Sequence, residues 1–322
     1  MKRLCNCIVF TILFSLLLPT GVRAAQLLIP GGQVIGLQLQ NDTITVADFD
    51  DTLGSHARKA GLCVGDEILS VNGQTVRSAG DVRTALENTG QTADITVRRD
   101  STTKTLQLMP RNTSEGPRLG IYLKQGIAGI GTVTWYDPAT GTFGTLGHGV
   151  NDPKGKLAEL KTGSIFPAEV ISVKKGTCGN PGQLKGNADV MNPCGRLLRN
   201  TPQGVFGISR QGWQGEPLPA ADYEEVSAGT ATIRSTVTGS TPREYSVEIL
   251  KIYPEDKPDG RNFLLKVTDP ALLSATGGIV QGMCGSPIIQ DGKLIGAVTH
   301  VLVNDPTRGY GIFIENMLNA AA

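Results

Sequence analysis

The sequence has almost no net charge, few histidines and few aromatic residues. Its 322 residues carry 30 Lys and Arg against 29 Asp and Glu, so it lacks the excess of positive charge with which proteins usually contact nucleic-acid phosphates. Its three histidines are scattered, without the close Cys or His spacing of a zinc site. A phosphate-binding loop of the Gly-x-x-x-x-Gly-Lys type is also missing. We therefore expect no cofactor, no metal and no nucleic-acid partner.

Long hydrophobic runs are also missing after the first residues, which excludes a membrane protein with several spans. Glycine is abundant instead, with 41 residues, or about 13% of the chain and roughly twice the ordinary usage. Together with many Val, Ile and Thr, this composition favours short strands joined by tight turns. The length suggests about two domains in a mainly β protein.

Residues 1–24 have the three parts of a secretory signal peptide. Lys2 and Arg3 form a basic start, Ile8–Leu18 is mostly apolar, and small residues suited to cleavage end at Ala24. As a helix this apolar run reaches only about 16 Å, against a hydrocarbon core of about 30 Å. We expect a cleaved signal and a chain exported across the cytoplasmic membrane, with a retained membrane anchor as the alternative.

Export changes the interpretation of the four cysteines beyond residue 24, because disulfides form in oxidising compartments. Cys178 and Cys194 flank a segment rich in Gly, Asn and Pro, and we expect them to form a disulfide, with two unpaired thiols as the alternative. Cys63 is expected to be a buried core thiol. The fourth, Cys284, lies in a motif described below.

Residues 28–112 resemble a PDZ domain. The run Ala60–Gly73 reads Ala-Gly-Leu-x-x-Gly-Asp-x-Ile-x-x-Val-Asn-Gly and ends in an Asn-Gly hairpin signal. A short helix is expected before it, from Ser55 to Ala60, and Val82, Ala85 and Leu86 recur at the spacing of a second helix. PDZ domains bind an extended peptide as an added strand beside a helix. The resemblance implies a small α/β domain with a peptide groove formed by Ile35, Gly36, Leu37, Val82 and Leu86.

Two smaller expectations concern the same region. His56 is expected to be an exposed helix residue without a chemical role. Residues 111–117 are polar and rich in turn formers, which suggests a linker to the second domain, residues 113–322. That second domain is strand-like and Gly-rich, with a helix expected only near its end, from about Glu315 to Ala321.

The first chemical motif of the second domain is Gly282–Pro287, Gly-Met-Cys-Gly-Ser-Pro. A small nucleophile between glycines can approach a carbonyl group closely, while the N–H groups of Gly282 and Cys284 face the oxyanion that forms in acyl transfer. The segment is similar to the Gly-x-Ser-Gly-Gly-Pro motif of chymotrypsin-like serine peptidases, with Cys284 at the nucleophile position. That resemblance implies a double β-barrel in which Val298, Thr299 and His300 form a strand that pairs with substrate. Ser286 is the alternative nucleophile.

The second motif surrounds His148, which lies between small residues after an apolar strand. This position suits a general base, although a lone histidine is also common as a structural residue. His300 is the competitor, but its place within a strand suggests a wall of the cleft.

Together these segments resemble the stage IV sporulation protein B family of sporulation signalling peptidases. The similar segments are Ile130–Pro138, Gly144–His148, Val267–Pro270, Gly277–Met283, Gly296–Val301 and Val303–Pro306. The family combines an N-terminal hydrophobic segment, a PDZ domain and a serine peptidase domain. The resemblance implies an enzyme exported into the space between forespore and mother cell, where it cleaves itself and a membrane-embedded regulatory protein.

The resemblance also implies residue roles: His148 as general base, Cys284 as nucleophile, and Asp269 as the group that orients the imidazole. The alternative for Asp269 is a turn residue that caps the segment at Pro270. The family has Ser where this chain has Cys284, so a second hypothesis is a catalytically inactive PDZ scaffold that binds peptide tails.

Overall fold

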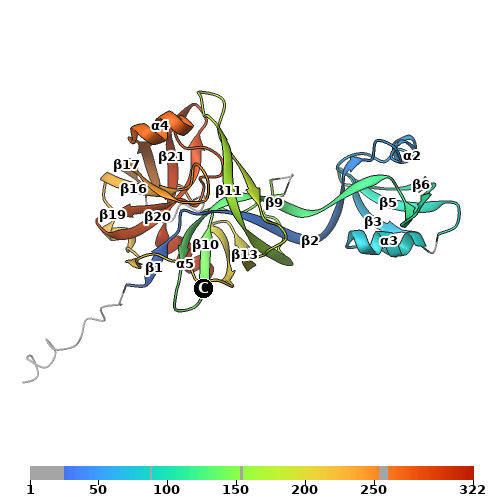
Figure 1. Cartoon of the computed structure of the whole chain (residues 1–322), viewed down its shortest axis with the longest axis horizontal. Helices are drawn as coiled ribbons and strands as arrows, with labels where there is room; N and C mark the ends of the chain where they lie inside the picture. The colour runs from blue at the N-terminus through green and yellow to red at the C-terminus, as the bar shows by residue number, and fades with distance from the viewer. Residues whose placement is uncertain (1–24, 88, 153–154, 254–259) are drawn as a thin grey trace, which may run out of the picture.

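The computed structural model describes residues 25–322 except residues 88, 153–154 and 254–259. The expected signal peptide, residues 1–24, lies outside the described residues. Strands dominate the described part, and none of its helices combines the length and apolar character needed to cross a membrane. The mainly β fold, with a PDZ domain and a β-rich peptidase domain, is confirmed (Figure 1).

Six antiparallel strands close the first barrel. In order around the ring they are β2 (Val34–Phe49), β9 (Ile121–Tyr136), β10 (Thr142–Thr145), β14 (Gly204–Ser209), β13 (Gly195–Thr201) and β11 (Thr162–Lys174), and β11 pairs again with β2. The core inside this barrel includes Ile35, Leu37, Val133, Phe143 and Ile165. Four short elements lie outside the ring: β1 (Leu27–Pro30), β12 (Gln183–Ala188), β15 (Leu218–Pro219) and the 3-10 helix Tyr223–Glu225.

The second barrel is also a closed ring of six antiparallel strands. In order they are β16 (Gly229–Ser235), β17 (Arg243–Ile252), β18 (Phe263–Val267), β21 (Asp305–Phe313), β20 (Lys293–Leu302) and β19 (Pro287–Gln290). Tyr245, Val247 and Ile249 of β17 alternate with more exposed neighbours and point into the core, as their spacing predicts. Two helices accompany this barrel: α4 (Pro270–Thr276), which was not expected, and α5 (Ile314–Ala321), which was.

The PDZ domain has its own core, which contains Ile44, Ile68, Val82, Leu86 and Ile95. Its remaining elements are α2 (Ser55–Lys59), β3 (Glu67–Val71), β4 (Gln74–Thr75), α3 (Ala79–Glu87), β5 (Ala93–Arg99) and β6 (Thr102–Leu108). Asn72 and Gly73 have φ of 51° and 76° and join β3 to β4, the backbone that an Asn-Gly hairpin turn requires. The segment expected as a linker instead forms a small hairpin, β7 (Arg111–Thr113) with β8 (Gly116–Arg118).

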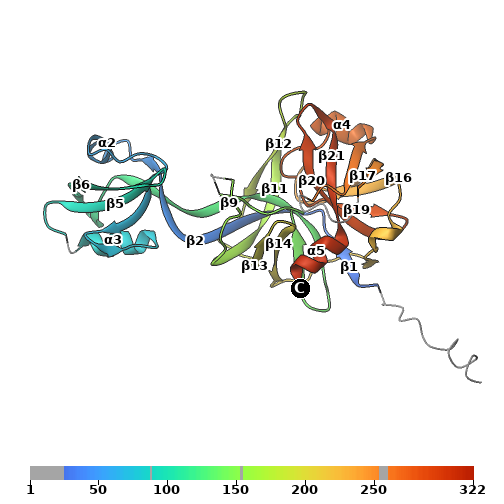
Figure 2. The same ribbon diagram turned by 180° about the vertical axis from the view of Figure 1, so that it is seen from behind.

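The PDZ domain is inserted into the first barrel. The first part of β2 pairs with β11 in that barrel, whereas Ile44 and Thr45 of the same strand pair with β3 of the PDZ domain. β9 returns beside β2 from the PDZ domain to the barrel, so two strands connect the two parts (Figures 1 and 2). The expected boundaries at residues 28–112 and 113–322 are therefore wrong at the N-terminal side, because Val34–Leu39 belongs to the peptidase barrel.

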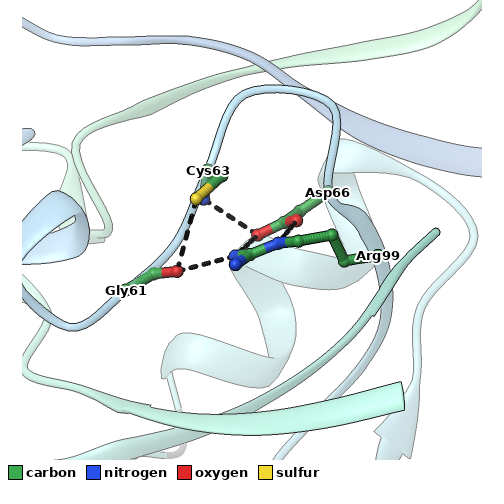
Figure 3. Close-up of polar contacts among 4 residues, drawn as sticks. All are labelled: Gly61, Cys63, Asp66 and Arg99. Carbon is green, nitrogen blue, oxygen red and sulfur yellow. Dashed lines mark hydrogen bonds and ion pairs between the residues drawn. The ribbon is translucent and has the colours of Figure 1, made fainter. Parts of the chain in front are cut away.

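An ion pair between the buried Asp66 and the partly exposed Arg99 holds the PDZ loop that contains Cys63 (Figure 3). The carboxylate of Asp66 is 1% exposed and accepts hydrogen bonds from Nε and a terminal nitrogen of Arg99 at 2.6 and 2.7 Å. Burial opposes ionisation of Asp66, but Arg99 and the N–H of Cys63 outweigh it and lower the pKa of the carboxyl group. Cys63 itself is exposed, with Sγ 3.6 Å from the carbonyl oxygen of Gly61, so the expectation of a buried thiol is wrong.

Candidate active site

Cys284 lies on a tight loop before β19, and strand β9 of the first barrel holds that loop. Thr132 donates from Oγ1 to the carbonyl of Gly282 at 2.8 Å and from its N–H to the carbonyl of Cys284 at 3.1 Å. Thr134 Oγ1 donates to the carbonyl of Gly285 at 2.8 Å. This loop of the second barrel, the candidate nucleophile loop, is thus positioned by hydrogen bonds from the first barrel.

His148 extends from the first barrel toward Cys284. It follows β10 after a turn in which Leu146 and Gly147 both have positive φ, 70° and 67°. A side chain at Gly147 would lie 2.9 Å from the Thr299 methyl group, so a glycine allows this turn to pack against β20. The imidazole interacts with the side chain of Cys284, and its Nδ1 lies 2.9 Å from the carbonyl oxygen of Gly149. With Nδ1 donating to Gly149, Nε2 is the nitrogen left to accept the thiol proton.

The surroundings of His148 raise its pKa. Burial of the ring lowers the pKa, but the interactions with the side chain and charge of Cys284, together with the Gly149 carbonyl, outweigh burial. The pKa therefore lies above its ordinary value of 6.5. The ring of His300 packs beside it, with the two ring centroids 5.6 Å apart.

The expected oxyanion donors are available. Gly282 and Gly285 have φ of 99° and 96°, so the loop around Cys284 turns in a way that favours glycine. Among the hydrogen bonds of the described residues, none uses the N–H of Gly282 or of Cys284. Both groups can therefore donate to an oxygen that develops negative charge near the thiol.

A cleft of about 550 Å³ opens at the thiol and the imidazole. It is lined by Leu37, Leu39, Ile127–Ile130, Leu146, His148–Asn151, Gln281, Gly282, Cys284 and Thr299–Val301. The expected substrate strand is placed in part: Thr299 and His300 line the cleft, whereas Val298 is fully buried in the second barrel. The thiol of Cys284 donates to the carbonyl of Thr299 at 3.0 Å, so the thiol lies against β20 on one wall of the cleft.

Ser286, the alternative nucleophile, is fully buried. Its hydroxyl group is hydrogen-bonded to that of Ser235 at 3.0 Å, and its N–H donates to the carbonyl of Met283. It cannot reach a substrate without unfolding of the loop.

Asp269 does not lie where the resemblance implied. Its carboxylate accepts a hydrogen bond from the N–H of Leu272 at 2.9 Å and caps α4, with a longer contact of 3.4 Å to the N–H of Ser246. The imidazole of His148 has the Gly149 carbonyl, not a carboxylate, at Nδ1. The capping alternative fits the structure, and the expected contact between Asp269 and His148 is not formed.

This placement predicts separate effects on stability and activity. Asp269→Ala should lower the free energy of unfolding by about 1 kcal/mol through loss of the cap. Asp269→Ser keeps a capping oxygen and should be nearly as stable as the wild type. Both variants should cleave peptide at wild-type rates per folded molecule, as measured by urea denaturation and peptide cleavage. A loss of activity on the order of 10⁴-fold in both would instead indicate that Asp269 orients the imidazole.

The residues expected to form the PDZ groove are found there only in part. Ile35, Gly36 and Leu37 pair with β9 and β11 inside the first barrel, so they cannot bind a peptide beside α3. A groove of about 220 Å³ lies between α3 and the start of β9. Its lining includes the expected Val82 and Leu86, together with Ala79, Arg83, Pro117, Arg118, Leu119 and Ile121–Leu123. The sequence signal that was missed is Leu119-Gly120-Ile121, a glycine between apolar residues at the start of a strand.

The expected disulfide is also absent. Cys178 is exposed in a turn, whereas Cys194 is buried in the core of the first barrel with Sγ 3.5 Å from the carbonyl of Ile165. Both are free thiols, and burial raises the pKa of Cys194. The two cysteines thus match the alternative of unpaired thiols.

Family models match both the peptidase part and the PDZ part of the chain. The family model described as SpoIVB peptidase S55 matches residues 115–318, and a PDZ-domain model matches residues 53–99. Among solved structures, the Rv3671c protease in an inactive form is 13% identical, with 60% of this chain and 84% of that chain covered and a TM-score of 0.36. An inactive serine-to-alanine mutant of Rv3671c from M. tuberculosis H37Rv is 15% identical, with 60% and 81% covered and a TM-score of 0.35.

A third similar structure is a PDZ domain. It is the PDZ domain of the SdrC-like protein Lmo2051 from Listeria monocytogenes, 18% identical, with 27% of this chain and 92% of that chain covered and a TM-score of 0.22. The peptidase model spans well over half of this chain and includes His148 and Cys284. The chain therefore belongs to the SpoIVB peptidase S55 family and is a peptidase that carries a PDZ domain.

Proposed function

We propose that this protein is an exported endopeptidase in which Cys284 is the nucleophile and His148 the general base. The observation that carries the proposal is that the thiol and the imidazole line one cleft and interact there, while the neighbouring Ser286 is buried. A nucleophile hydrogen-bonded to a base that a second group orients is the arrangement used in covalent acyl transfer.

The proposed reaction uses only groups of this site. His148 Nε2 takes the thiol proton, and Sγ of Cys284 attacks the peptide carbonyl carbon. The resulting oxyanion accepts hydrogen bonds from the N–H groups of Gly282 and Cys284. The imidazolium then protonates the leaving amine, and a water molecule, deprotonated by His148, hydrolyses the thioester.

The proposed substrates are the protein itself and a membrane-associated regulatory protein of a sporulating cell, cleaved outside the cytoplasm. The family and the PDZ domain support this choice, since a PDZ domain recruits extended peptide segments. A catalytically inactive scaffold that binds peptide tails is the competing function, and the following measurement separates the two.

Alkylation of Cys284 by iodoacetamide tests the site directly. We expect fast labelling near neutral pH and labelling at least about tenfold slower in His148→Ala, because removal of the base leaves a thiol that is mostly protonated. Labelling of the exposed Cys63, followed in the same sample by mass spectrometry, provides the internal control. Equal labelling rates of Cys284 in both proteins would favour the scaffold.

The raised pKa of His148 sets the pH dependence of cleavage. A general base must be neutral, so cleavage should fall as pH decreases through this pKa, with a midpoint of kcat/KM above 6.5. The same shift favours the protonated ring in the folded state. Its contribution to stability is therefore present below pH 6.5 and is lost as pH rises through the folded pKa. A cleavage midpoint below 6.5 would contradict the assignment of His148.

A further inference from the structure

Strand β9 lines both the PDZ groove and the active-site cleft. Its first residues, Ile121–Leu123, form one wall of the groove opposite α3. Farther along, Ile127–Ile130 lines the cleft, and Thr132 holds the nucleophile loop. The groove and the catalytic thiol are thus joined by one strand, which runs through both parts of the molecule (Figure 1).

At both ends of β9, alternate residues direct their backbone groups away from β2. In the PDZ domain, Val46 of β2 uses its N–H and carbonyl for Asp66 and Gly65, so the groups of Leu123, opposite Val46, face the other edge of β9. In the barrel, the N–H and carbonyl of Thr132 bond to Cys284 and Leu146 on that other edge. By alternation, the N–H and carbonyl groups of Ile130 and Ala128 face the same edge.

In the part of the chain that the structure describes, this edge is unpaired from the groove to the cleft. Among the described residues, no strand pairs with Ile121–Ile130 except β2, which covers the opposite edge. Tyr122, Lys124, Ala128 and Gly129 are exposed along it. Gly126, with φ of 75°, marks the bend between the two segments. An open strand edge is a template for the addition of an extended chain.

The groove end of β9 is suited to a terminal carboxylate. Arg83 and Arg118 both line the groove, and Arg118 is also ion-paired with Glu115, so Arg83 is the main source of positive charge there. Gly120 has φ of 67°, and within the described residues the N–H groups of Leu119 and Gly120 donate to no acceptor. Unpaired backbone N–H groups at a turn beside arginines are a recognised way to bind a peptide C-terminus.

We propose that β9 binds the C-terminal tail of a substrate protein along its whole free edge, from the PDZ groove to the catalytic thiol. The tail runs antiparallel to β9, with its carboxylate at Leu119 and Gly120 and its upstream residues at Ala128 and Ile130. Strand pairing is one residue to one residue, so the stretch from Ile121 to Ile130 spans about ten residues, or roughly 30 Å. The inference rests on the proposed function and adds its substrate class: tails cut about ten residues before a free C-terminus.

We call the proposed binding path along the free edge of β9 the track. Peptide binding to the full-length Cys284→Ala protein tests the track without catalysis. The probes are three synthetic libraries: random 16-residue peptides with a free carboxylate, the same peptides as C-terminal amides, and random six-residue peptides with a free carboxylate. We expect retention of the first library to exceed that of the other two by about tenfold, because only its members engage both segments. Binding of the 16-residue peptides with a free carboxylate should also slow amide hydrogen exchange at Ala128 and Ile130. Equal retention of long and short peptides, or of acids and amides, would overturn the proposal.

Ala128→Pro removes one N–H on the free edge and leaves the pairing with β2 intact, since proline is tolerated at strand edges. We expect it to reduce retention of the 16-residue library to the level of the six-residue library. Ala128→Thr keeps the N–H and should behave as the parent protein. Equal retention by the two variants would exclude pairing of the tail at this position.

Cleavage of random 30-residue peptides by the wild-type protein measures the number of residues between the cut and the free C-terminus. Cuts mapped by mass spectrometry should cluster about ten residues before the free carboxylate, and amidation should disperse them. Cuts spread evenly along the peptides would overturn the track but support the peptidase. No cleavage together with selective binding of the 16-residue acids would support the track and contradict the proposed function.

Discussion

Cys284→Ala is expected to abolish peptide cleavage and self-cleavage, with a loss of at least about 10³-fold in kcat. The thiol is the proposed nucleophile and lines the cleft beside His148. The hydroxyl group of Ser286 cannot replace it, since Ser286 is buried against Ser235. Cleavage of a fluorogenic peptide mixture and mapping of self-cleavage products provide the measurement.

Two further substitutions serve as controls for this result. Cys284→Ser restores the nucleophile that the family carries and should retain cleavage. Ser286→Ala should also retain cleavage, because its hydroxyl group makes only a structural hydrogen bond. Activity that survives in Cys284→Ala but is lost in Ser286→Ala would transfer the nucleophile role to Ser286.

Gly285→Ala is expected to have the second large effect, on both the loop and the activity. A Cβ at this position would lie 2.1 Å from the carbonyl oxygen of Thr132 and 2.5 Å from the backbone nitrogen of Leu146. Both contacts are with backbone, and φ is 96°, so the loop cannot accept the methyl group without moving. We expect a loss of more than about 3 kcal/mol in the free energy of unfolding.

Gly292→Ala is the matched control for that prediction. Gly292 also has positive φ, 75°, but it lies in the exposed turn between β19 and β20 with no atom within 4 Å of an added Cβ. Only backbone strain remains there, about 1 kcal/mol, and cleavage should be unchanged. Similar losses in urea denaturation for the two variants would show that the contacts between barrels do not hold the nucleophile loop.

The elements that could be predicted from sequence are those with a local physical cause. Asn72 and Gly73 adopt positive φ readily, so the PDZ hairpin follows from two residues. The alternation in β17 and the glycines around Cys284 likewise require no knowledge of distant contacts. The contact between His148 and Cys284 was inferred from family resemblance, because 136 positions separate the two residues and no local pattern links them.

The errors come from features that depend on distant partners. The alternation of Ile35 and Leu37 predicts a strand, but it does not say that the strand pairs with β11 of the barrel. Spacing could not reveal that Cys194 points into a core while Cys178 is exposed. The helix α4 did have a local signal, since Asp269 and Pro270 begin it and Gly277, with φ of 76°, ends it.

Insertion of the PDZ domain through both β2 and β9 decides how it can be separated from the catalytic barrels. A single cut in the chain would leave the domain attached by its other strand, so self-cleavage at one site cannot release it. Truncation before residue 113 would remove Val34–Leu39 and open the first barrel. Leu39 and Ile127 face each other across the ladder, so a short turn in place of residues 40–126 would excise the PDZ domain while both ends stay paired.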